Sequence, residues 1–297
     1  MAPAAPAYRT EPVAPFAPAA PVAPRDRIEA LLRERKLDCT LTTALPSGLD
    51  SDAVAPFGLS ALDTRLAGGL PRGQVSELVG PVSSGRTALA WTWLGAATAR
   101  GESVALIDSF DRFDPASATT CGIDLARLLW VRGQAITKTT AAVDPAWLPG
   151  ARAVDGPGTL LERTIDRALK ALNLVLQSGV CTAVVFDCAD VPLSGIRRVP
   201  LTTWLRLQRV IEGTDTACLL IGPVPLARSA GGVTITTGAM GATGAMGATG
   251  AALWNGSHDR SRRLAGLAIT ARLSSPRRTV HGSVNLQAVS RAVAIVE

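Results

Sequence analysis

The sequence predicts an α/β fold: a mostly parallel, twisted sheet flanked by helices, with antiparallel strands near the C-terminus. Three observations predict it. Short apolar runs typical of buried strands alternate with longer segments in which apolar residues recur every three or four positions. The composition is 47% hydrophobic and only 4% aromatic, so small aliphatic side chains must build the core, as in buried parallel sheets. A glycine-containing loop joins one predicted strand to the helix that follows it.

The individual elements follow from these patterns in chain order. Apolar runs bounded by glycine or polar residues predict strands, and apolar residues at helical spacing predict helices. The predicted strands are 75–79, 103–107, 181–186 and 218–221, and residues 125–131 lead into a further strand. The predicted helices are 87–100, 159–178 and 202–212. Three later runs, 264–273, 279–286 and 288–296, predict an antiparallel extension of the sheet. Because strands and helices alternate before that extension, we expect βαβ units and parallel pairing.

The chain divides into three predicted parts. Residues 1–24 contain seven prolines and nine alanines; such a segment cannot bury enough apolar surface to offset its ordering entropy, so we expect a disordered or extended arm. Residues 25–55 are expected to form an N-terminal helix and a polar linker, and residues 56–297 the core. Within the core, the Gly-rich stretch 224–263, with its repeat GAMGATGAMGATG, is expected to be a flexible loop.

The predicted N-terminal helix is amphipathic. Ile28, Leu31 and Leu32 fall on one face of a helix that spans residues 25–37. This face either packs on the protein's own core or docks on another subunit. The three side chains are therefore candidate partner-binding residues.

The charge balance is basic. A net charge of +6 and a pI of about 9.5 favour an anionic partner, nucleic acid above all; the alternative is that the charge only keeps the protein soluble. The five cysteines include no C-x-x-C pair and there are two histidines, so no zinc spacing can be built. The cysteine pattern predicts a protein with reduced thiols. We expect it to be cytoplasmic with no membrane partner, because neither a signal peptide nor a strongly apolar span is recognisable.

A candidate phosphate-binding loop, GPVSSGRT at residues 80–87, follows a predicted strand and opens a predicted helix. In that context the loop's backbone N–H groups can curl around an anion at the helix N-terminus. The candidate phosphate ligands are Gly80, Ser83, Ser84, Gly85, Arg86 and Thr87. Thr87 stands where a hydroxyl would hold Mg²⁺. Arg86 stands where the motif has lysine, and its planar fork is not equivalent to a compact ammonium group.

The segment 68–89, GGLPRGQVSELVGPVSSGRTAL, resembles the opening of the bacterial RecA recombinase core. The resemblance continues through LIDSFDRFDP at 106–115, and it resumes at 184–187 and 219–223. It implies a RecA-like P-loop core over roughly residues 57–297.

The resemblance also implies that the ATP chemistry has decayed. The glutamate that activates the attacking water corresponds to Phe110, which cannot accept a proton; Asp111, one residue along, is the alternative base. The aromatic residue that stacks on adenine corresponds to Ser117. The glutamine that senses the γ-phosphate corresponds to Pro223, which has no hydrogen-bond donor. Asp187 keeps the position that supports Mg²⁺.

We therefore expect an inactive or nearly inactive ATPase with no intact catalytic residue and no required cofactor. ATP and Mg²⁺ are expected to bind weakly, if they bind. Thr87 and Asp187 are the expected metal ligands only when a Mg-nucleotide is bound.

A RecA-like core that has lost its ATP chemistry most resembles the ImuA-type accessory proteins of the bacterial mutasome. That resemblance implies a non-catalytic role in the DNA damage response and translesion synthesis (SOS mutagenesis). The implied partners are RecA, a Y-family polymerase-like mutasome protein, or both, with single-stranded or damaged DNA as a further candidate, at the bacterial nucleoid. Two alternatives stay open: a DNA-dependent ATPase of recombinase type that uses Arg86 and Asp111, and a cell-division inhibitor, a role that related RecA-like folds serve.

Two predicted loops carry candidate DNA contacts. In RecA two loops face DNA. They correspond here to the loop after the predicted strand 181–186, which precedes Asp187, and the loop after the predicted strand 218–221, which precedes Pro223. Here the first loop contains Arg197 and Arg198, and the second is flanked by Arg260, Arg262 and Arg263. Arginine side chains on such loops suit phosphate contacts that fix position without reading sequence; the alternative is a solvated turn.

Overall fold

The computed structural model describes residues 54–133, 160–227, 232–240, 246–247, 251–256, 263–276, 278, 280–289 and 295–296. The described residues all belong to one compact unit, Asp50–Glu297. The predicted arm at 1–24 and the predicted helix with Ile28, Leu31 and Leu32 lie outside the described residues.

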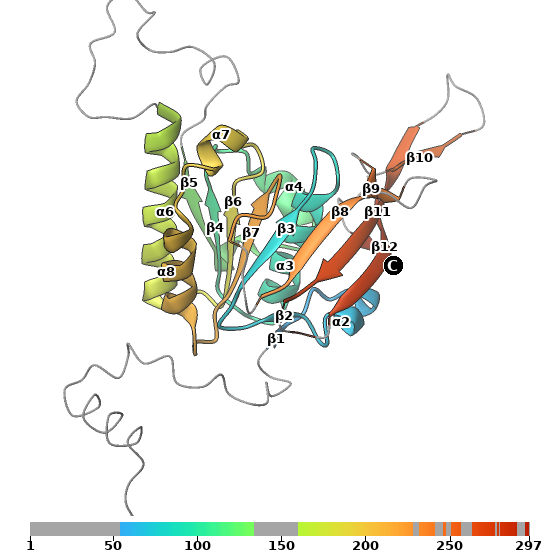
Figure 1. Ribbon diagram of the computed structural model, residues 1–297. Coiled ribbons are helices and arrows are strands. Elements are labelled where there is room, and N and C mark those ends of the chain that lie inside the picture. Colours follow the sequence, from blue (N-terminus) through green and yellow to red (C-terminus); the bar gives the residue numbers. More distant parts are fainter. Residues whose placement is uncertain are drawn as a thin grey trace, which may run out of the picture. The chain divides into compact units, whose positions relative to one another are not determined.

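One mixed sheet organises the core (Figure 1). From edge to edge its order is β13 (Ile295–Val296), β12 (His281–Val289), β11 (Arg263–Ser274), β8 (Thr234–Met240), β3 (Val75–Val79), β7 (Ala217–Gly222), β6 (Ala183–Asp187), β4 (Val104–Asp108) and β5 (Leu128–Arg132). All pairings from β8 to β5 are parallel. Strands β11, β12 and β13 add antiparallel pairings at the other side. The predicted fold class is confirmed.

Helices cover both faces of the parallel strands (Figure 1). On one face lies α3 (Arg86–Ala99), and on the other lie α6 (Leu160–Ser178) and α8 (Leu201–Ile211). Side chains alternate along a strand, so Ala183 and Val185 of β6 join the hydrophobic cluster of α3, while Val184 and Phe186 join that of α6 and α8. Apolar side chains on both faces explain why β4 and β6 read as hydrophobic runs up to their final aspartate.

Shorter elements complete the fold. The short helices are α2 (Ser60–Arg65), α4 (Pro115–Thr120), α7 (Leu193–Ile196) and a 3-10 turn at Leu125–Arg127. Two short strands pair with the main sheet, β10 (Ala251–Asn255) with β11 and β9 (Met246–Gly247) with β8. A separate antiparallel pair, β1 (Val54–Ala55) and β2 (Leu70–Pro71), closes the start of the core.

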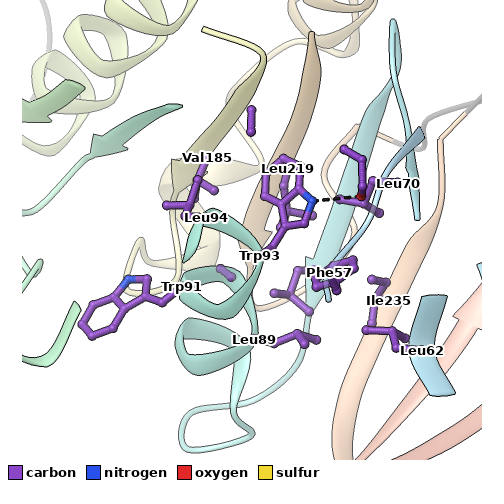
Figure 2. Packing of buried hydrophobic residues seen from close by; sticks show 14 of the residues in the cluster. Phe57, Leu62, Leu70, Leu89, Trp91, Trp93, Leu94, Val185, Leu219 and Ile235 are labelled. Carbon is purple, nitrogen blue, oxygen red and sulfur yellow. Dashed lines mark hydrogen bonds between the residues drawn. The ribbon is translucent and has the colours of Figure 1, made fainter. Parts of the chain in front are cut away.

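Trp93 is the largest fully buried side chain among the described residues and lies at the centre of the α3 cluster (Figure 2). Its indole Nε1 donates a hydrogen bond of 3.1 Å to the carbonyl of Ala55 on β1. Its ring lies 6.2 Å from the ring of Phe57, measured between centroids. The indole thus ties the first strand of the core to the helix that follows the phosphate loop.

The Gly-rich segment contains more regular structure than its composition predicted. Strands β8 and β10 lie within 224–263, so the prediction of a flexible loop is wrong for those residues. Val233 and Ile235 are buried, and buried residues alternate with partly exposed ones from 233 to 237, which is the pattern of a strand packed on one face. The glycines and alanines that follow masked this signal.

The structure corrects or refines three further predictions. Within the predicted strand 288–296, residues 288–289 end β12 and residues 295–296 form β13, and residues 290–294 lie outside the described residues. The loop before Arg197 contains the helical turn α7. The last two residues of the predicted polar linker form strand β1. Ala55 of this strand is fully buried and pairs with β2, so it belongs to the core.

The described part of the chain bears on the expectations about membrane spans and cysteines. None of its helices is both long and apolar enough to cross a membrane. Its four cysteines, Cys121, Cys181, Cys188 and Cys218, form no disulfide within the described part of the chain.

Candidate nucleotide site

The predicted phosphate loop connects β3 to α3 and is anchored to β8. Ser84 is buried, and its hydroxyl lies 2.8 Å from the hydroxyl of Thr237, which also donates to the carbonyl of Val79. A Cβ atom on Gly80 would lie 2.5 Å from the Thr237 hydroxyl, so this close approach requires glycine. Gly85 adopts φ of 87° as it caps α3, a conformation that also favours glycine. These local demands explain both glycines of the motif.

Arg86 is buried at the first turn of α3, with 6% of its surface exposed. Its Nη1 atom has no hydrogen-bond partner among the described residues. Burial lowers the pKa of the guanidinium, and the charges of Asp187 and Asp190 oppose that shift. A buried, unsatisfied cationic donor at a helix N-terminus suits an anion with several acceptor oxygens.

A small pocket of about 190 Å³ lies beside this loop. It brings together four of the predicted ligands, Ser83, Arg86, Thr87 and Asp187. Gly80, Ser84 and Gly85 shape the loop but do not line the pocket. Pockets that hold whole small molecules are usually larger, on the order of 300–1,000 Å³. The space therefore fits a phosphate group and is tight for an entire nucleotide.

Asp187 ends β6 and faces the phosphate loop across the pocket. Burial raises the pKa of its carboxyl group to about 6; the charges of Asp108 and Asp190 raise it further, and the amide of Ala189 and the charge of Arg86 act in the opposite direction. The ionised carboxylate is thus disfavoured by its surroundings when no cation other than Arg86 is near.

The raised pKa of Asp187 predicts a specific pH dependence of stability. The folded state binds this proton more tightly than the unfolded state, so the free energy of unfolding should fall as pH rises from about 4 to about 6. The contribution is about 2–3 kcal/mol. Asp187→Asn should remove it. Urea unfolding of both proteins across this range measures the difference, and parallel pH profiles would contradict the assigned cause.

Phe110 cannot serve as a general base, and the structure buries it. It follows β4 and packs, 6% exposed, in the cluster of α6 and α8. The neighbouring Asp111 accepts two hydrogen bonds of 2.8 Å from the guanidinium of Arg132. These hydrogen bonds hold the pKa of Asp111 below its usual value, which weakens it as a proton acceptor. Arg132 in turn stacks 4.5 Å above the ring of Trp130, so the ion pair is positioned from both sides.

The two other replaced positions lie away from the pocket lining. Ser117 lies on α4, and its hydroxyl donates to the carboxylate of Asp114. Pro223 follows β7 directly. Neither residue is among the described residues that line the pocket.

The structure describes three of the five predicted DNA-contacting arginines. Arg197 and Arg198 are exposed beside α7, and Arg198 pairs with Glu162 of α6. Arg263 is the first residue of β11. Arg260 and Arg262 lie outside the described residues.

Three features of the site were not predicted. Glu77 of β3 is 1% exposed, and its Oε1 accepts hydrogen bonds from the amides of Leu226 and Ala227. Thr237 anchors the loop, and Arg112 pairs with Asp190 at 3.6 Å beside the pocket. Only Glu77 left a signal in the sequence, as a carboxylate within an apolar strand. The other two act through residues distant in the sequence.

The fold and the loop define a P-loop α/β protein, and the comparisons with known proteins narrow that class. Residues 48–142 match the family described as the RecA N-terminal domain. Protein RecA of Roseiflexus sp. (strain RS-1) is 47% identical over 77 residues, which are 26% of this chain and 22% of that protein. Protein RecA of Chlorobium chlorochromatii (strain CaD3) is 43% identical over 84 residues, 28% of this chain and 24% of that protein.

This chain also matches a relative from a plant. The DNA repair protein recA homolog 1, chloroplastic, of Arabidopsis thaliana is 40% identical over 72 residues, 24% of this chain and 16% of that protein. The matched segments thus span about a quarter or less of these relatives. These matches and the sheet topology support a RecA-like core in this chain.

Proposed function

We propose that this protein is a non-catalytic, RecA-like accessory protein of the bacterial DNA damage response, similar to the ImuA-type proteins that act in translesion synthesis. One observation carries the proposal: the position of the water-activating glutamate holds Phe110, whose ring is buried in the core. The ring also lines the phosphate pocket, and an apolar ring there has no group that could accept a proton from an attacking water.

The alternative base is also occupied. Asp111 is held by two hydrogen bonds to Arg132, so freeing its carboxylate would break a bidentate pair that is positioned over Trp130. Loss of a single well-placed base commonly reduces turnover by about 10²–10⁴-fold. The absence of a side-chain donor at Pro223 adds to this loss.

The remaining groups fit an anion better than a catalytic nucleotide. Arg86 supplies a buried donor without a partner among the described residues, and Thr87 supplies a hydroxyl beside it. Asp187 is placed to support a cation near that hydroxyl. A bound Mg·ATP would supply phosphate oxygens for Arg86 to contact. Binding is expected to be weak, because the pocket measures about 190 Å³ and Ser117 offers no ring for the adenine.

In this role the protein acts through its surfaces. The proposed partners are RecA, a Y-family polymerase-like mutasome protein, or both, and single-stranded or damaged DNA is a further candidate at the exposed Arg197 and Arg198. A place at the bacterial nucleoid in the cytoplasm follows from such partners. Arginine contacts of this type bind phosphates without reading base sequence.

Purified full-length protein should show no ATP turnover that single-stranded DNA stimulates. The assay compares wild type with Asp187→Ala, since any turnover that both proteins share comes from a contaminant, and a RecA recombinase serves as positive control. We also expect Mg·ATP to change the melting temperature little. The second candidate, a DNA-dependent ATPase, is favoured by the convergence of Arg86, Thr87 and Asp187 on one pocket. DNA-stimulated turnover that Asp187→Ala abolishes would establish it and refute the non-catalytic role.

A further inference from the structure

A groove runs between α6 and α8, the two helices that lie side by side on one face of the sheet (Figure 1). Its volume is about 810 Å³, roughly four times that of the phosphate pocket at about 190 Å³. The two sites share no lining residue. The groove is therefore a separate feature of the core.

The floor of the groove is apolar. It is formed by aliphatic side chains of both helices and of the segment between α7 and α8, namely Ile165, Leu169, Val199, Leu207 and Val210. Ile165 and Leu207 belong to the buried cluster beneath, whereas Leu169, Val199 and Val210 pack against it and remain partly accessible. An accessible aliphatic floor gains free energy when apolar side chains cover it.

The walls of the groove are basic. Five cationic residues line it, Arg163, Lys170, Arg198, Arg206 and Arg209, against the two carboxylates of Glu162 and Asp166. The excess is therefore three positive charges. Arg198 is already paired with Glu162. Lys170, on α6, and Arg206 and Arg209, on α8, are exposed and form no ion pair within the described part of the chain.

We propose that this groove binds an acidic, amphipathic helical segment of a partner protein. The apolar side chains of such a helix would cover the aliphatic floor, and its acidic side chains would meet Lys170 on one wall and Arg206 on the other. Charge complementarity of this kind steers association and sets the orientation of the bound segment.

Nucleic acid fits the groove less well. A phosphate backbone has no apolar side chains to cover the floor. Proteins that bind single strands stack bases on aromatic rings, and none of the described residues that line the groove is aromatic. The basic walls alone would suit either partner, so the floor decides between them.

The proposal deepens the adaptor role by naming a surface and the chemistry of its partner, and it rests on that role for its biological use. It does not depend on the loss of ATP turnover, because the groove and the phosphate pocket share no residue. Groove binding alongside DNA-stimulated turnover would refute the non-catalytic role alone. A missing interaction alongside absent turnover would refute the groove alone.

The test uses full-length protein and a fluorescein-labelled peptide of about 18 residues, or about five helical turns. Leucine lies on one face of the peptide helix and glutamate on the other, and a scrambled peptide of the same composition is the peptide control. The groove variant is Lys170→Glu with Arg206→Glu. The matched protein control is Arg65→Glu with Arg272→Glu, which makes the same charge change at two exposed arginines of α2 and β11. Fluorescence anisotropy measures each Kd, and melting curves compare the folding of the variants.

We expect saturable binding of the amphipathic peptide and binding at least about fivefold weaker for the scrambled peptide. The groove variant should raise Kd by about fivefold or more, the control variant by less than about twofold, and added salt should weaken binding. Absent binding, equal binding of both peptides, or equal losses in both variants would overturn the proposal. Displacement of the peptide by a single-stranded oligonucleotide whose own affinity falls in the groove variant would assign the groove to nucleic acid instead.

Discussion

Trp93→Ala is expected to lower the free energy of unfolding by about 3–5 kcal/mol. The side chain is fully buried between α3 and the sheet (Figure 2). Its removal leaves a large cavity and deprives the carbonyl of Ala55 of its indole donor. Since domains of this kind have total stabilities of about 5–15 kcal/mol, the variant should be marginally folded. Urea unfolding followed by far-ultraviolet circular dichroism measures the loss.

Two further variants separate the causes. Trp93→Phe keeps a buried ring and removes the indole donor, so we expect a smaller loss of about 1–3 kcal/mol. Trp254→Ala truncates an indole that is 54% exposed on β10, and should change stability by less than about 0.5 kcal/mol. A loss for Trp93→Ala no larger than that for Trp254→Ala would contradict the central place of Trp93 in the core.

The parallel half of the core could be predicted from the sequence because its strands are buried on both faces. Residues 104–107 of β4 and 183–186 of β6 read as unbroken apolar runs, and each run lies between polar residues. The helix α6 was predictable from the spacing of its buried residues. These signals are local, so they survive without knowledge of which strands are neighbours.

The C-terminal half was harder because one face of its strands is exposed. In β11 and β12 the buried residues alternate with exposed ones, as in Leu273 beside Arg272 and Leu286 beside Gln287. Antiparallel strands of this type have weaker apolar patterns. In β8 the pattern was further obscured by the glycines and alanines that follow it. The boundaries there were correspondingly less accurate.

The candidate site was predictable only where motif residues lie at a strand end or in the loop and first helical turn that follow one. Ser83, Arg86, Thr87 and Asp187 meet in one pocket because the carboxyl ends of parallel strands share one edge of a sheet. The partners that restrain these groups lie far along the chain. The hydroxyl of Thr237 contacts a residue 153 positions away, and Asp111 binds a guanidinium 21 positions away. No local pattern identifies such partners.

Glu77 is the clearest case of a residue whose role depends on a distant segment. It lies on the central strand β3, and its Oε1 receives the amide of Ala227 at 2.6 Å and the amide of Leu226, 150 and 149 residues away. These two amides lie within the segment that leads from β7, which ends at Gly222, to β8, which begins at Thr234. Backbone amides in an irregular segment have no regular backbone acceptor, and the buried carboxyl group of Glu77 supplies one for these two amides.

Glu77→Ala is therefore expected to lower the free energy of unfolding by about 2–5 kcal/mol, because it leaves two amides without an acceptor and opens a cavity beside β8. Glu77→Gln retains a carbonyl oxygen that can accept from both amides, so its loss should be about 1 kcal/mol or less. Urea unfolding gives the two losses, and hydrogen exchange of the amides of Leu226 and Ala227 reports the cause directly: their protection should fall sharply in the alanine variant and little in the glutamine variant. Equal losses in both variants would mean that the charge of the carboxylate, and not its acceptor geometry, holds this segment on the central strand.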